Sequence, residues 1–188
     1  MKVVEESGKL VVLDEAYADF APQSLVREAA KYPNLLVLRS FSKAYGLAGL
    51  RIGYGAGDSE IIDWMRAAQS PFSVNSIAQE TCKLVLDNKR IYNNFIMKVM
   101  EERKYLQAEL QMVNGVVPYD SDANFILFRL MGDMRSPEVQ KKLLAAGIEV
   151  RDRGSLPMLE NCLRVTVAGR ETNMKFIDEL EKCLRGTT

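Results

Sequence analysis

The sequence predicts an α/β protein, because two buried strands flank a helix near its start and a second pattern of elements follows a long helix. The apolar runs Lys9–Leu13 and Leu35–Leu38 have the length of buried strands and lead into charged residues. Between them, Gln23–Tyr32 has the pattern of a helix that Pro33 ends. A strand, a crossover helix and a second strand form a parallel pair, so we expect a mainly parallel sheet here.

The remaining elements divide the chain into two parts. Ile91–Met112 has helical periodicity and is long enough to link two domains. Before it, we expect a third strand and two helices, at Arg51–Ala56, Asp58–Ala68 and from Ser76. After it, strands and helices are expected at Asn124–Leu130, Pro137–Ala146 with Gly147 as C-cap, Ile148–Arg151, Cys162–Val167 and Glu171–Leu184. We therefore expect part of a large domain at residues 1–90 and a small α+β domain at residues 91–188.

The composition excludes several classes of function. The 188 residues include 25 basic and 25 acidic side chains, so no charge excess points to nucleic acid or a membrane surface. No signal peptide pattern or membrane-spanning apolar stretch is present. Cys82, Cys162 and Cys183 are scattered, which argues against disulfides or a metal site and fits a reducing cytoplasm. Histidine is absent, so catalysis would depend on other side chains or a cofactor.

The strongest local signal is the segment SFSKAYGLAGLR, Ser40–Arg51, which directly follows a predicted strand. Lys43 is therefore expected at the carboxyl edge of the sheet, near the hydroxyls of Ser40 and Ser42 and the guanidinium of Arg51. Hydroxyl donors and a fork-shaped cation suit a phosphate dianion. A lysine beside them could form a Schiff base with an aldehyde. Taken alone, such a lysine is usually a solvated surface residue, and Ser42 could simply cap the following turn.

A second segment, DEAY, ends the neighbouring predicted strand and carries Asp14 and Tyr17. A buried carboxylate facing a pyridine nitrogen would keep that nitrogen protonated and make the ring an electron sink. A tyrosine hydroxyl nearby could bind the phenolic oxygen of the same ring. The alternative is a strand-ending aspartate beside a packed tyrosine.

Together, DEAY and RSFSKAYGLAGLRIGYGAG resemble the signature of fold-type I aminotransferases that use pyridoxal 5'-phosphate (PLP), most closely the histidinol-phosphate aminotransferase branch. The match continues in order through PFSVNSIAQ, ANFILFR, GIEVRDRG and LRVTVAGRETN. The resemblance implies that Asp14 pairs with the pyridine nitrogen and Tyr17 with the phenolic oxygen. It also implies that Lys43 is the Schiff-base lysine and proton shuttle, that the phosphate is held by Ser40, Ser42 and Arg51, and that the substrate α-carboxylate is held by Arg164.

The resemblance further implies amino transfer from histidinol phosphate to 2-oxoglutarate in histidine biosynthesis, by a cytoplasmic homodimer. Family members are about twice this length, so we expect a C-terminal half with weak PLP binding and an exposed Lys9–Leu13 edge that pairs with another chain. Another enzyme of the branch, an aromatic aminotransferase or a threonine-phosphate decarboxylase, remains an alternative. So does a catalytically silent fragment that only dimerises.

Four further residues have two readings each. Arg151 and Arg153 could bind an anion, although paired arginines near a strand end are more often solvated or bridged to neighbours such as Asp152. Asn75 and Asn124 could line the pocket, and loop capping accounts for them equally well.

Overall fold

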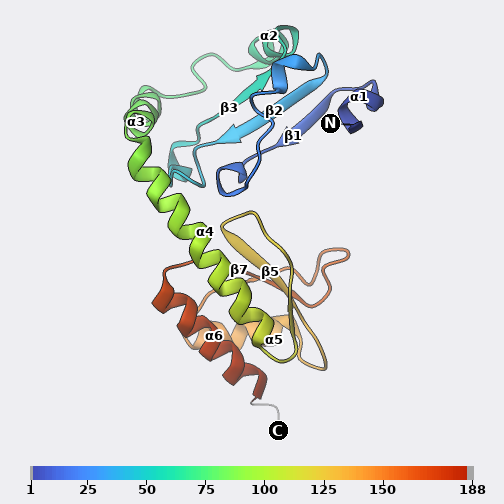
Figure 1. Ribbon diagram of the computed structural model, residues 1–188, viewed down its shortest axis with the longest axis vertical. Coiled ribbons are helices and arrows are strands. Elements are labelled where there is room, and N and C mark those ends of the chain that lie inside the picture. Colours follow the sequence, from blue (N-terminus) through green and yellow to red (C-terminus); the bar gives the residue numbers. More distant parts are fainter. Residues whose placement is uncertain (1, 186–188) are drawn as a thin grey trace. The chain divides into compact units, whose positions relative to one another are not determined.

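The computed structural model describes residues 2–185, and the chain divides into two compact units, one up to Ile96 and the other from Met97. The division falls within the long helix α4 (Lys89–Met112), which the sequence predicted as a link. The boundary expected at residue 90 lies in the first turn of this helix. Each unit contains its own sheet (Figure 1). This mixture of sheets and helices confirms the α/β fold class.

The sheet of unit 1 has three strands in the order β1 (Val11–Asp14), β2 (Leu35–Ser40) and β3 (Gly53–Gly57), with β2 in the centre (Figure 1). β1 and β2 are parallel, as predicted, and β3 is antiparallel to β2. The expectation of a mainly parallel sheet is therefore wrong for these three strands. The reason is local: the Phe41 N–H donates to the Ile52 carbonyl at 3.2 Å, which closes the connection as a hairpin loop.

The predicted helix at Gln23–Tyr32 is also wrong. Only a single 3₁₀ turn, η2 (Ala29–Lys31), forms there, and another, η1 (Ala18–Phe20), follows β1. The Leu25 N–H donates at 2.6 Å to the carboxylate of Glu15. A backbone donor held by a side chain from the end of β1 favours an irregular connection, so tertiary contacts outweigh the helical pattern.

The helices after β3 agree with the sequence. α2 (Ser59–Ala68) begins after Asp58, whose side chain accepts from the Glu60 N–H. α3 (Ser76–Asp87) begins after Asn75, whose side chain accepts from the Ala78 N–H at 2.8 Å. Asn75 is therefore a helix cap, one of its two predicted readings. A short helix, α1 (Lys2–Ser7), and the 3₁₀ turn η3 (Ala48–Leu50) were not predicted.

The core of unit 1 is small and lies on one face of its sheet. Its buried members are Val4, Ala29, Leu35 and Val37, and partly buried side chains that include Val11 and Leu13 pack against them. The alternation of a strand places Val11 and Leu13 on the same face as their partners Leu35 and Val37. The opposite face carries Val12 and Leu36.

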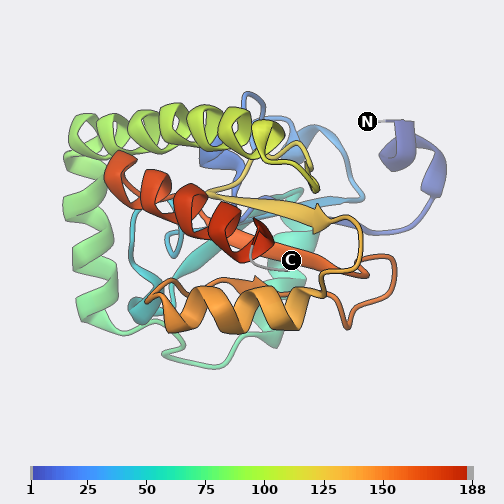
Figure 2. The same cartoon turned by 90° about the horizontal axis from the view of Figure 1, so that it is seen from below.

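Unit 2 has an antiparallel sheet in the order β4 (Val116–Pro118), β5 (Phe125–Leu130), β7 (Cys162–Thr166) and β6 (Arg151–Asp152). Helices α5 (Ser136–Ala145) and α6 (Arg170–Arg185) lie side by side (Figure 2). The core joins α4, α5 and α6 to the sheet through side chains that include Leu110, Phe128, Leu143, Leu163 and Leu180. β4 was not predicted, and β6 starts later than expected.

The cysteines are free and buried at all three positions, Cys82, Cys162 and Cys183. Burial raises the pKa of the Cys82 and Cys183 thiols, which lowers their reactivity. Within residues 2–185, none of the helices combines the length and apolar character that crossing a bilayer requires.

Candidate functional site

The ends of β1 and β2 present different chemistry on the two faces of the sheet. Asp14 pairs with Leu38 in the parallel register, so Asp14, Leu38 and Ser40 share one face. We call this the Asp14 face. Glu15 and Arg39, the next residues along, point to the opposite face and form an ion pair there. The polar residues at the strand ends are thus divided between two sets.

The structure brings Tyr17 and Lys43 together beyond the ends of these two strands. The Lys43 Nζ lies 5.3 Å from the centroid of the Tyr17 ring, within the range of a cation–π contact. The Gly46 N–H donates to the Lys43 carbonyl at 3.2 Å, and Gly46 has a left-handed φ of 68°. Lys43 is exposed, so its amine is accessible from solvent at the tip of a defined turn.

Within residues 2–185, the side chains of Asp14 and Ser40 form local hydrogen bonds. Asp14 Oδ1 accepts from the Ala16 N–H at 2.9 Å, and Ser40 Oγ accepts from the Ser42 N–H at 3.0 Å. The turn before Lys43 is therefore capped by Ser40 rather than by Ser42. Asp14 is exposed, whereas the sequence argument assumed a buried carboxylate. Asp14 is exposed because its side chain points away from the core of unit 1, which lies on the other face of the sheet.

Arg51 lies at the other end of the Lys43 loop. It has a left-handed φ of 53°, and its Nη1 donates to the Ala48 carbonyl at 3.0 Å. With Leu38, Gly53 and Gly55 it lines a cavity of about 640 Å³. Leu38, Gly53 and Gly55 share the Asp14 face, because Gly53 pairs with Ser40 and Gly55 with Leu38. Ile62 and Met65 of α2 line the same cavity, so Arg51 borders a depression between the sheet and α2.

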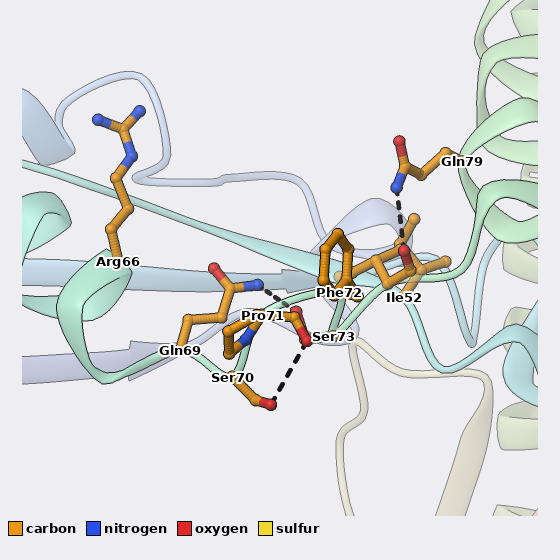
Figure 3. Close-up of a pocket in the computed structure, with 10 residues that line it drawn as sticks. Ile52, Arg66, Gln69, Ser70, Pro71, Phe72, Ser73 and Gln79 are labelled. Atoms are coloured by element: carbon orange, nitrogen blue, oxygen red, sulfur yellow. Dashed lines mark hydrogen bonds between the residues drawn. The ribbon is translucent and has the colours of Figure 1, made fainter.

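A neighbouring cavity of about 610 Å³ extends the same depression (Figure 3). Gly53, Arg66, Gln69 and Ser73 line both cavities. In Figure 3, Arg66 extends from α2 away from the other labelled residues, and the Gln69 amide donates to the Ser73 hydroxyl. No predicted site residue lines this second cavity, so it widens the polar surroundings of Arg51 without adding to the predicted set.

A buried polar network that was not predicted from the sequence lies on the face opposite Asp14. Arg39 Nη1 donates to Glu15 Oε2 at 3.1 Å and to Ser24 Oγ at 3.0 Å, and its Nη2 donates to Asp19 Oδ1 at 2.6 Å. We call Glu15, Asp19, Ser24, Arg39 and Tyr45 the Arg39 network. Opposite charges directly after Asp14 and directly before Ser40 were a signal that could have found it.

The electrostatics of the network favour its charged form. Burial alone would raise the pKa of Glu15, but hydrogen bonds from Ser24, the Leu25 N–H and Arg39 outweigh it and hold the pKa below its usual value. Burial would likewise lower the pKa of Arg39, and the Asp19 and Glu15 carboxylates raise it instead. Charge balance within the pairs therefore compensates the cost of desolvation.

Tyr45 joins the network to the Lys43 loop. Its hydroxyl donates to Asp19 Oδ1 at 3.4 Å, and burial followed by the Asp19 charge raises its pKa. Its ring centroid lies 5.3 Å from that of Phe41 and 5.8 Å from that of Tyr92. Tyr45 is two residues after Lys43, so these contacts fix the part of the loop next to the lysine.

Arg164 lies in the second unit, on β7. Its guanidinium stacks 4.8 Å from the Phe125 ring centroid, and its Nε is buried without a hydrogen-bond partner among residues 2–185. Arg151 of β6 lies directly opposite it in the register. Asp152, which could have neutralised Arg151, accepts from Ser136 and Gly154 instead. Facing like charges are unfavourable by themselves, so the pair suits an anion.

The comparisons with known proteins match one family over nearly the whole chain. The family "Aminotransferase class I and II" matches residues 1–178. A histidinol-phosphate aminotransferase from Ruminiclostridium cellulolyticum is 37% identical over 171 residues, which cover 91% of this chain and 47% of that protein. The chain spans about half the length of the curated relatives it matches.

Two solved structures are similar to the chain over most of its length. One is a histidinol-phosphate aminotransferase from Sinorhizobium meliloti in complex with pyridoxal-5'-phosphate, with a TM-score of 0.86 and 25% sequence identity. The match covers 100% of this chain and 53% of that chain. The other is an L-threonine-O-3-phosphate decarboxylase from Porphyromonas gingivalis, with a TM-score of 0.83 and 29% sequence identity. That match covers 93% of this chain and 55% of that chain.

Proposed function

The chain belongs to the aminotransferase class I and II family, and on this premise we propose that it is part of a PLP-dependent histidinol-phosphate aminotransferase. The proposed reaction transfers an amino group from histidinol phosphate to 2-oxoglutarate. Because the chain spans about half the length of its relatives, the proposal concerns the activity to which these residues contribute. Residues 1–90 would belong to the cofactor-binding domain and residues 91–188 to the small domain.

One observation carries the proposal: the Lys43 amine lies over the Tyr17 ring, just beyond the ends of two adjacent parallel strands. The groups at these strand ends and in the Lys43 loop have the chemistry that PLP requires. Asp14 offers a carboxylate for a protonated pyridine nitrogen, Tyr17 a phenol for the ring oxygen, and Lys43 an amine for the aldehyde. The donors suited to a phosphate dianion are the hydroxyls of Ser40 and Ser42 and the guanidinium of Arg51.

When bound, PLP supplies an electron sink for the carbanion character that develops at the substrate Cα. The chain's own residues would hold and orient the reacting groups. Lys43 would move the proton at the substrate Cα, and Asp14 would keep the proton on the pyridine nitrogen. Arg164 would hold the α-carboxylate of 2-oxoglutarate and of the glutamate formed from it. With its neighbours it would also hold the phosphate of histidinol phosphate, which has no carboxylate. Its Nε, buried without a hydrogen-bond partner among residues 2–185, supports this role. Arg151, which lies opposite it, would add a second donor for the anion.

The direct test is to incubate the chain with excess PLP, reduce it with borohydride and map the labelled peptides. We expect label on Lys43 and its loss in Lys43→Ala. Lys31→Ala is the matched control, because Lys31 is an exposed lysine of the same unit that pairs only with Glu28. Label spread evenly over the lysines, or label that survives in Lys43→Ala, would contradict the assignment.

A decarboxylase of the same family is the second candidate, supported by the similarity to the Porphyromonas gingivalis enzyme. The two reactions differ in the bond that breaks at the substrate Cα, which is C–H for amino transfer and C–CO₂⁻ for decarboxylation. Full-length protein incubated with PLP and either histidinol phosphate or a phosphorylated amino acid would separate them. The first case predicts exchange of the Cα hydrogen of histidinol phosphate and amino transfer to 2-oxoglutarate, and the second predicts release of CO₂ from the amino acid. Release of CO₂ without amino transfer would overturn the first proposal.

We propose that the chain self-associates through the outer edge of β1. β1 is an edge strand of the described sheet, and Leu10 and Val12 are 57% and 52% exposed. Sedimentation should find a dimer, and Val12→Lys should shift it towards monomer. A strictly monomeric wild-type chain would refute this. A chain that dimerises while Lys43 stays unlabelled would instead be the catalytically silent alternative.

We also propose that the protein works in a reducing compartment, the cytoplasm. Its three buried cysteines are free thiols, which supports this assignment. Thiol titration of denatured protein from its source cells should find all three in the reduced form. A disulfide in that material would refute the assignment.

A further inference from the structure

We propose that Arg39 is a positioning residue for Lys43, which acts through Asp19 and Tyr45 from the face of the sheet opposite Asp14. The inference rests on the proposed function only for the role of Lys43. The positioning itself is a claim about the geometry of the chain.

Arg39 links the end of β2 to the segment that follows β1. It is one residue before Ser40 and four before Lys43, and its side chain crosses to two other segments. Through one nitrogen it binds Glu15 and Ser24, and through the other it binds Asp19. Glu15 is the neighbour of Asp14, so a single side chain fixes the ends of β1 and β2 against each other. Relative movement of these ends would break several bonds at once.

The second step leads from Asp19 to the lysine. Asp19 Oδ1 accepts from both Arg39 and Tyr45, and Tyr45 is two residues after Lys43. The loop is closed at its ends by the Phe41 N–H, which donates to Ile52, and it turns at Lys43 through the Gly46 N–H. A short, closed loop transmits a shift at Tyr45 to the lysine. Asp19 and Tyr17 also lie on the same turn, because the Phe20 N–H donates to the Tyr17 carbonyl at 3.0 Å.

The third step is the requirement for an arginine. The acceptors belong to three residues, Glu15, Asp19 and Ser24, and the two ends of the guanidinium fork reach them from one planar group. A lysine at position 39 keeps the charge but has one nitrogen, so it cannot span the same acceptors. The positioning inference therefore predicts that Arg39→Lys releases the loop even though the local charge is unchanged.

The experiment measures where the Lys43 amine lies without using the cofactor. Reductive methylation with ¹³C-formaldehyde converts lysines to dimethyl-lysines, which keep their positive charge. Methyl groups over the Tyr17 ring experience its ring current, so the Lys43 methyl signal should be displaced from those of the exposed lysines. Tyr17→Leu removes the ring and gives the undisplaced position, and Lys43→Arg assigns the signal.

We expect Arg39→Lys and Tyr45→Phe each to move the Lys43 signal towards its position in Tyr17→Leu, while the Lys31 signal stays unchanged. Tyr45→Phe removes a single hydroxyl, so it tests the link without disturbing the fold. Arg66→Lys is the matched control, because Arg66 pairs with Asp63 on the surface. A Lys43 signal that stays displaced in both Arg39→Lys and Tyr45→Phe would overturn the inference.

Labelling with PLP then separates this inference from the proposed function. At saturating PLP, Arg39→Lys should slow labelling of Lys43 about tenfold, as expected for a small displacement of a reacting group. The PLP concentration that gives half the maximal rate should change little, because Arg39 belongs to no proposed PLP contact. If wild-type Lys43 is not labelled, the proposed function fails, and the methyl signals still decide the positioning. If both proteins are labelled equally fast, the positioning inference fails alone.

Discussion

Replacement of Arg39 by methionine should destabilise unit 1 strongly, because it leaves two buried carboxylates without their cation. The side chains of Arg39, Glu15 and Asp19 are only 10%, 8% and 13% exposed, so little solvent is available to replace the lost bonds. Methionine fills most of the volume of the arginine stem. The change therefore tests the charge and its hydrogen bonds more than the packing.

The magnitude follows from what each carboxylate retains. Glu15 keeps its bonds from Ser24 and the Leu25 N–H, which offset part of its loss. Asp19 keeps only the long bond from Tyr45, and its Oδ2 is already buried without a partner among residues 2–185. Removing one partner of a buried pair costs about 3–5 kcal/mol. With the compensation at Glu15, we expect about 3 kcal/mol, most of it from Asp19.

Urea unfolding is the assay, followed by circular dichroism and by the fluorescence of Trp64. Trp64 is the single tryptophan and lies in α2, so it reports on unit 1. Arg66→Met is the control, and its exposed pair with Asp63 should contribute almost nothing. Arg39→Met combined with Asp19→Asn should recover part of the loss, because the uncompensated charge is gone. A loss below about 1 kcal/mol in Arg39→Met would refute the reasoning and show that the network is solvated.

Three further predictions follow from single positions. Gly53→Ala should destabilise unit 1 and disturb the Lys43 loop in amide exchange, because an added Cβ would lie 2.5 Å from the Arg39 carbonyl, whereas Gly49→Ala meets nothing within 4 Å and should be neutral. The stabilisation of unit 1 by Glu15 should be lost in acid. The pKa of Glu15 in the folded protein lies below its usual value of 4.5, so this stabilisation is fully present above pH 4.5 and is lost as the pH falls through the folded pKa. Urea midpoints should show this loss in wild type, and an equal acid loss in Glu15→Gln would contradict it. Leu110→Ala should cost unit 2 about 2–5 kcal/mol in urea unfolding, because Leu110 is fully buried, and exposed Leu144→Ala should cost little; equal effects would argue against the packing described here.

The elements that the sequence predicted correctly are those with local causes. The runs at β1 and β2 are apolar because both strands contribute to a buried core, and Asp58 and Asn75 mark the starts of α2 and α3 by capping them. These signals lie within the element that they specify. The direction of β3 has no such signal, because it depends on a hydrogen bond between the two ends of the Lys43 loop.

The wrong helix at Gln23–Tyr32 has a similar explanation. Its pattern is helical, but the Glu15 carboxylate binds the Leu25 N–H. Glu15 lies outside the predicted helix, at the end of the preceding strand, so the helical pattern itself holds no sign of this bond. The same limit applies to the Arg39 network, whose members come from three separate segments. In contrast, the contact between Tyr17 and Lys43 was accessible to reasoning from sequence, because both follow adjacent parallel strands.

The division between the two faces of the sheet explains why the proposed site depends on residues that touch no ligand. β3 contributes only glycines to the Asp14 face, at positions 53, 55 and 57. An added Cβ at Gly55 would lie 3.0 Å from the Met65 side chain, so the absence of a side chain there lets α2 approach this face closely. The glycines add no side-chain packing of their own. On the other face the apolar core is small, and the Arg39 network extends it to the ends of the strands. Because successive residues of a strand point to opposite faces, the ion pair of Glu15 and Arg39 links the two strand ends directly behind Asp14 and Ser40.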